Sequence, residues 1–200
     1  AVGVVNVDGD LSVYQAVFEP GSSLATSNLS VRQGGTLTLN VPVMVQSFGK
    51  SGTTGFGECA VKGDGALTCL GNFRFSGGEL SGGGAITTDT LTVSLDYVNG
   101  NTNARTVTVK SGGSFTSSAG GRILVNSGRI ELMGGEFAVN STKSDLFKGG
   151  GILFIGPSGT LHRSSGTSTL AHENLTTNAG TIKASTGTLN FTGGMVQTAT

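Results

Sequence analysis

The sequence predicts an all-β protein folded as a parallel β-helix, a solenoid in which each three-sided coil of chain takes about 22 residues. Three observations predict it. Glycines recur at regular intervals, the short stretches between them alternate apolar and polar residues, and no stretch shows the apolar spacing of an amphipathic helix. Strands of three to five residues bury too little surface alone, so the stacking of successive coils must stabilise them.

The repeated unit is one or two glycines, a small or polar residue, and then an apolar residue. Four of its copies follow one another at nearly equal intervals, each close to one coil, at Gly113, Gly135, Gly159 and Gly180. Other copies are seven residues apart, and three sevens make about one coil. Glycine suits the corners because a sharp bend requires a positive φ. We expect three short strands in each coil, with the right-handed crossover usual for parallel strands.

The apolar residues that follow these glycines are expected to lie inside the coil. At near-coil intervals they are Phe115, Phe137, Leu161 and Ile182. An antiparallel sandwich also has many short strands, but the equal spacing favours the solenoid.

Residues 1–200 are expected to form a single solenoid segment, part of a longer chain or assembly, with an irregular insertion at 41–80. Within the insertion, Lys62-Gly-Asp-Gly65 is a tight-turn signal, which predicts a projecting hairpin at 58–70. Cys59 and Cys69 flank this turn, so we expect a disulfide and an oxidising compartment. Two buried thiols are the alternative.

Composition narrows the class of protein. Charged residues make up only 12 % of the chain and the formal net charge is zero, which argues against nucleic acid or an anionic membrane as a partner. No apolar run is long enough to cross a bilayer, so no membrane insertion is expected. Four Asn-x-Ser/Thr sequons permit N-glycosylation, at Asn28, Asn140, Asn174 and Asn190.

No catalytic, cofactor or metal site is expected. Enzymes on β-helices need clustered acids, and stacked pairs are conceivable among Asp96, Arg105, Glu131 and Glu136. However, the twelve acids are dispersed, and both glutamates alternate with apolar residues as a solvated face would. His162 and His172 are far from the cysteines in sequence, and the segment 6–17 lacks the Gly and Glu of a calcium loop.

Two stretches carry a family resemblance: 178–194, with the sequence NAGTIKASTGTLNFTGG, and 107–115, with VTVKSGGSF. They resemble the coils of large cell-surface β-helices such as autotransporter passengers and filamentous-haemagglutinin-like adhesins. The resemblance covers about residues 85–200 and, more weakly, 20–40. It implies an extracellular, non-enzymatic structural or adhesive rod that assembles end to end with itself or with neighbouring solenoid segments, with surface glycans as further partners. A carbohydrate-binding or polysaccharide-degrading β-helix is the alternative.

Overall fold

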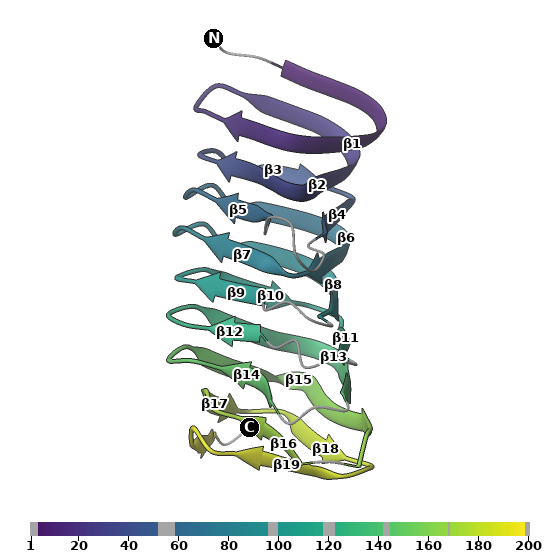
Figure 1. Cartoon of the computed structure of the whole chain (residues 1–200), viewed down its shortest axis with the longest axis vertical. Coiled ribbons are helices and arrows are strands. Elements are labelled where there is room, and N and C mark those ends of the chain that lie inside the picture. Colours follow the sequence, from purple (N-terminus) through teal and green to yellow (C-terminus); the bar gives the residue numbers. More distant parts are fainter. Residues whose placement is uncertain are drawn as a thin grey trace.

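The computed structural model describes residues 4–51, 59–95, 100–117, 123–141, 145–167 and 169–198. Every regular element in this part of the chain is a β-strand, and the strands stack into one elongated solenoid (Figure 1). In chain order the strands are β1 (Val4–Phe18), β2 (Ser23–Leu39), β3 (Val43–Val45), β4 (Ser47–Ser51), β5 (Ala60–Lys62), β6 (Leu67–Ser76), β7 (Gly78–Ser81), β8 (Ile86–Ser94), β9 (Gly100–Asn103), β10 (Thr106–Val109), β11 (Gly113–Ser117), β12 (Ile123–Val125), β13 (Arg129–Ser141), β14 (Asp145–Lys148), β15 (Ile152–Ser165), β16 (Thr169–His172), β17 (Leu175–Asn178), β18 (Thr181–Ala184), β19 (Thr188–Phe191) and β20 (Met195–Gln197).

The strands form three lateral faces, and every described pairing between coils is parallel. Face 1 runs through β3, the first halves of β6 and β8, β10, the first halves of β13 and β15, β17 and β20. One column of aligned residues on this face consists of Val43, Leu67, Ile86, Val107, Ile130, Leu153, Thr176 and Met195. Successive members of the column are one coil apart, and the parallel β-helix with coils of the expected length is therefore confirmed.

The other two faces are built in the same way. Face 2 runs through the middle of β2, β4, the second halves of β6 and β8, β11, the second halves of β13 and β15, and β18. Face 3 runs through the end of β2, β5, β7, β9, β12, β14, β16 and β19. Long strands such as β13 bend from one face to the next, as their register shifts show.

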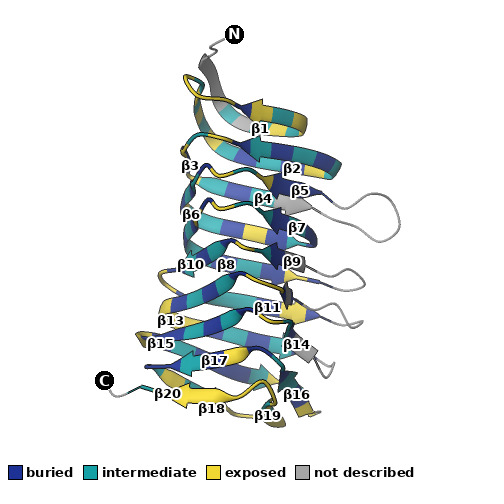
Figure 2. Ribbon diagram, turned by 90° about the vertical axis from the view of Figure 1, so that its left-hand side faces the viewer, coloured by how far each residue is buried: buried dark blue, intermediate teal, exposed yellow. Residues whose placement is uncertain are grey.

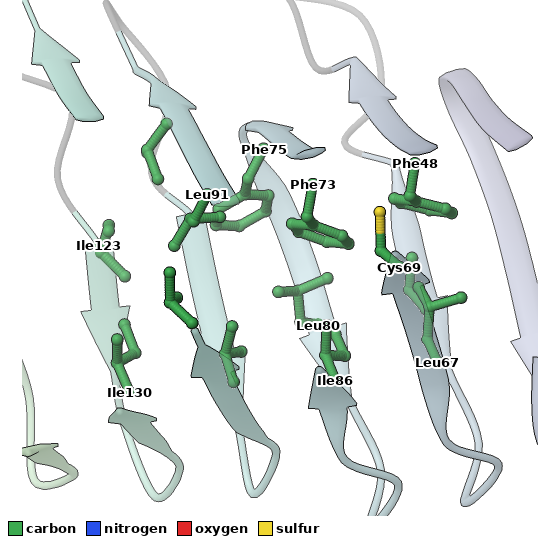
Figure 3. Packing of buried hydrophobic residues seen from close by; sticks show 14 of the residues in the cluster. Phe48, Leu67, Cys69, Phe73, Phe75, Leu80, Ile86, Leu91, Ile123 and Ile130 are labelled. Carbon is green, nitrogen blue, oxygen red and sulfur yellow. The ribbon is translucent and has the colours of Figure 1, made fainter. Parts of the chain in front are cut away.

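The core is a set of inward columns, because alternate residues of a strand point to opposite sides of the sheet. Figure 2 shows the resulting alternation of buried and less buried residues along the strands. On face 2, Phe48 and Phe73 stack with ring centroids 4.9 Å apart and planes 7° from parallel. Figure 3 shows both rings among the neighbouring aliphatic side chains of the interior. Phe137 aligns with Leu161 and then with Ile182, as expected, whereas Phe115 lies in the adjacent inward column beside Val139.

In the described residues of the predicted insertion, 41–51 and 59–80, the chain follows the regular stack, so the insertion and the hairpin predicted at 58–70 are wrong there; residues 52–58 lie outside the described residues. Both β5 and β6 belong to the regular stack: Val61 pairs with Leu37 and Leu80, and Leu67 pairs with Val43 and Ile86. The Lys-Gly-Asp-Gly segment is a corner between face 3 and face 1. Glycine and aspartate suit a corner as well as a hairpin turn, and a long coil followed by a short one hides the period in this region.

The last described coil, 181–198, is more open than the coils before it. Met195 continues an inward column of face 1, yet its side chain is 50 % exposed. Ile182, Leu189 and Phe191 are only partly buried. Among the described pairings, β18, β19 and β20 have strand partners on one side only.

Candidate functional sites

The structure separates the charged residues that the sequence offered as a catalytic cluster. Glu131 lies on the outer side of face 1, Glu136 lies where β13 enters face 2, and Arg105 is buried in a corner. Asp96 lies outside the described residues. The three described residues therefore lie at three different places in the fold, and the groove described below includes none of them.

Glu131 is held by its neighbours on face 1. It accepts hydrogen bonds from Thr108 Oγ1 at 2.9 Å, one coil earlier, and from Arg129 Nε at 2.6 Å. The Arg129 guanidinium in turn lies 4.7 Å from the centroid of the Phe154 ring. Hydroxyl, cation and ring therefore fix this carboxylate in place on the sheet.

The same kind of contact recurs along the molecule. Each of the seven acidic side chains that the structure describes contacts a group about one coil away along the chain. The pairs are Glu19 with Asn40, Asp64 with the Gly83 amide, Glu79 with Asn103, Asp89 with Ser111, Glu131 with Thr108, Glu136 with His162, and Glu173 with Lys148. These carboxylates tie coil to coil.

Glu136 belongs to a three-residue chain of hydrogen bonds on face 2. His162 Nδ1 is 2.8 Å from Glu136 Oε1, and His162 Nε2 is 2.8 Å from Ser185 Oγ. The His162 side chain is only 11 % exposed, whereas Glu136 and Ser185 reach solvent. Sequence reasoning missed His162 and Ser185, although each neighbour in this chain of hydrogen bonds is about one coil from the next along the sequence.

Arg105 contacts backbone carbonyls and is not clustered with the acidic side chains. Its side chain is fully buried and donates to the carbonyls of Ser81 at 2.8 Å, Gly84 at 2.7 Å and Gly63 at 2.5 Å, with a longer contact to Gly65 at 3.4 Å. Burial lowers the pKa of the guanidinium, and the nearby Asp64 carboxylate acts in the opposite direction. The cation thus joins the corners of two preceding coils.

A second buried polar group lies inside the C-terminal coils. Arg163 and His172 occupy inward positions, on face 2 and face 3, and both are fully buried. The His172 ring lies between Phe147, at a centroid distance of 5.5 Å, and Phe191, at 4.8 Å. Burial, and then the charge of Arg163, lower the pKa of His172 to about 3, so the imidazole is neutral near pH 7.

A shallow polar groove of about 360 Å³ lies on the outer side of face 2 near the N-terminal end. Gly49 lies among the outward-facing residues of face 2, next to Ser30. Because glycine has no side chain, the surface is lower at this position. None of the lining residues is acidic. The polar ones around Gly49 include Asn28, Ser30, Ser47, Asn72 and Arg74.

The predicted disulfide is wrong. Cys59 and Cys69 are both buried and no bond joins them. They lie on either side of a corner, because Cys59 precedes β5 on face 3 and Cys69 ends the face 1 part of β6. The Cys69 thiol donates to the carbonyls of Asn72 at 3.2 Å and Gln46 at 3.5 Å. The described residues contain no group of three or more metal-ligating side chains.

The four sequons differ in their surroundings. Asn190 is exposed, and Asn28 and Asn140 are half-buried. Asn174 is fully buried, and its Nδ2 donates to the carbonyls of Val125, Gly149 and Gly151. A glycan at Asn174 would require this corner to open.

No protein-family model, no curated protein and no solved structure matches this chain. Within the described residues, no helix has the length and apolar character needed to span a membrane.

Proposed function

We propose that this chain is a section of an extracellular structural or adhesive rod, which acts through its shape and through the surface that it displays. The observation that carries the proposal is that the described carboxylates contact groups in neighbouring coils. All seven described acidic side chains tie one coil to the next instead of converging on a groove. Such ties hold long flat faces in register.

A polysaccharide-degrading β-helix would use its acids differently. Glycoside hydrolysis needs two carboxyl groups flanking one bond, separated by about 5–10 Å. Here Glu131 is held between Thr108 and Arg129 on face 1, while Glu136 is held by His162 on face 2. The described acids therefore favour a scaffold over a glycosidase.

The open coil at 181–198 supports assembly along the axis. Its strands carry backbone groups that accept a further parallel strand, and Met195 offers apolar surface to whatever covers it. A second copy of the chain, or a neighbouring solenoid segment, would extend the rod by continuing the three faces.

An assay of glycan cleavage tests the proposal against the polysaccharide-degrading alternative. Purified chain is incubated with polyuronates and neutral polysaccharides, and new reducing ends or unsaturated products are measured. No turnover above the buffer control is expected. Turnover that is lost in Glu131→Gln and kept in the matched tie variant Glu173→Gln would overturn the proposal and favour a carbohydrate-active enzyme.

Glycan binding without cleavage is a second candidate, favoured by the groove at Gly49. Amides, hydroxyls and the Arg74 guanidinium supply both donors and acceptors for sugar hydroxyls. The test is titration of the chain with oligosaccharides, comparing Arg74→Ala with the exposed Arg32→Ala as control. Loss of binding in the first variant alone supports this site, whereas equal binding by both variants rejects it.

A further inference from the structure

We propose that Ser185 is a base-activated nucleophile, with His162 as its general base and Glu136 as the residue that positions the imidazole, and that the site transfers acyl groups from small carboxylic esters. The inference does not rest on the proposed rod function. It rests on one juxtaposition, in which a hydroxyl, an imidazole and a carboxylate from three successive coils form a continuous hydrogen-bonded chain.

The distances meet the requirement for an activated serine. A nucleophile must lie within about 2.6–3.2 Å of its base, and the base must be oriented by a third group. The Ser185 to His162 and His162 to Glu136 distances are both 2.8 Å. With the Nδ1 proton donated to the Glu136 carboxylate, the Nε2 lone pair is left to accept the hydroxyl proton of Ser185.

The fold holds this arrangement in place. Glu136 is on β13 and His162 is on β15, and these strands pair along most of their length. Ser185 directly follows β18, and its amide donates to the Arg163 carbonyl at 3.0 Å. His162 is largely shielded from water, while the serine remains exposed to an incoming ester. The base is therefore fixed on a rigid sheet and the nucleophile is accessible.

Lys183 supplies a positive charge beside the site. It is the strand partner of His162 on the same outer face, two residues before Ser185. A lysine ammonium that reaches the serine would stabilise the negative oxygen that develops when an acyl carbonyl is attacked. The described contacts show no enclosed pocket around Ser185, so the site suits small acyl groups on good leaving groups better than peptides.

The reaction balances with the groups present and water. Ser185 Oγ forms a bond to the acyl carbon as its proton passes to His162 Nε2. The carbon–oxygen bond to the leaving alcohol then breaks, and the alcohol takes that proton from the imidazolium. A water molecule, deprotonated by His162, releases the acid and regenerates the serine hydroxyl.

Labelling with a fluorophosphonate tests the nucleophile directly. The whole chain is incubated with the probe, the added mass is measured, and the labelled residue is identified by peptide mass spectrometry. Ser111 is the matched control, because it is an exposed serine bonded directly to the Asp89 carboxylate with no imidazole. We expect a single adduct at Ser185, a loss of at least about 100-fold in rate for His162→Gln, and no change for Ser111→Ala.

The positioning role of Glu136 has its own readout. Glu136→Gln should slow labelling of Ser185, because the carboxylate that orients the imidazole through Nδ1 is gone, whereas Glu136→Asp, which keeps a carboxylate, should restore part of the rate. Hydrolysis of p-nitrophenyl acetate should be reduced in the same order across the variants. If Ser185 of the folded wild-type chain is labelled no faster than Ser111, the proposal is overturned, and the three residues only tie neighbouring coils together. The glycan-cleavage assay does not depend on Ser185, so the rod proposal and the acyl-transfer proposal can each fail without the other.

Discussion

Arg105 and Asn174 occupy the same corner of the solenoid, three coils apart, and both side chains donate to backbone carbonyls of the two preceding coils. The residues between them at this register position are Gly128 and Gly151. A Cβ on Gly128 would lie 2.5 Å from the Arg105 carbonyl oxygen, and one on Gly151 would lie 2.5 Å from the Gly128 carbonyl oxygen. At this register position two glycines therefore lie between two polar side chains, Arg105 and Asn174, that hydrogen-bond to the preceding corners.

Removing the Arg105 side chain should weaken the fold strongly. Arg105→Met leaves the corner carbonyls that the guanidinium contacts without this donor, and we expect the free energy of unfolding to fall by about 3 kcal/mol. Urea denaturation followed by circular dichroism measures it. Arg32→Met, at an exposed position, is the control. A loss below about 1 kcal/mol would show that the buried cation contributes little.

The corner glycines should be far less tolerant than a glycine on a face. Gly128→Ala forces a methyl group against the Arg105 carbonyl and should cost about 1–3 kcal/mol. Gly49→Ala meets only the Ser30 Cβ, at 3.7 Å, and should be neutral or stabilising by about 0.5 kcal/mol, since glycine in a strand costs conformational entropy. Melting temperatures of the two variants check the difference, and equal shifts would contradict the stacking of the corner.

Stability should fall through His172 as the pH is lowered. The pKa of this imidazole is about 3 in the folded chain against an ordinary value of 6.5, so the unfolded chain binds the proton first. The contribution is present above pH 6.5 and is lost between about 6.5 and 3, at up to about 1.4 kcal/mol per pH unit. His172→Phe, which keeps a ring between Phe147 and Phe191, should flatten the pH dependence of the denaturation midpoint. An unchanged dependence would place the imidazole in contact with water.

The two cysteines should behave as protected thiols. Without reductant, an alkylating reagent should add to neither Cys59 nor Cys69 in the native chain and to both in denaturant, because both side chains are buried. Intact mass after each treatment reports the number of adducts. If the two cysteines are alkylated in denaturant only after reductant is added, a disulfide joins them and this prediction is wrong.

Much of the architecture could be predicted because the alternation within each strand and the spacing between coils both indicate a stacked solenoid. Alternation predicted inward positions for Phe137 and Leu161, and glycine spacing predicted the length of the coil. Residues 41–80 misled the prediction because the step from Val43 to Leu67 is longer than an average coil and the step from Leu67 to Ile86 is shorter, which breaks a regular period. The Cys59 and Cys69 pattern fits a hairpin and a solenoid corner equally well.

Polar residues inside the coil were harder to predict, although the sequence carried a signal. Arg163 is two residues after Leu161, and His172 is two residues after Leu170, so strand alternation alone places both inside. Their burial depends on neighbouring coils that composition does not reveal. The contact between His162 and Ser185 depends likewise on the register of β15 with β18, which spacing indicates only to within a few residues.

Electron cryomicroscopy of the native material that contains this chain tests the central claim, that it is a section of a rod, most directly. The account predicts rods in which strands about 4.8 Å apart run across the long axis, with the coil at 181–198 covered by a further parallel coil from a copy of the chain or a neighbouring segment. Isolated particles in which that coil stays exposed to solvent, or is sealed by an element other than a β-coil, would contradict it.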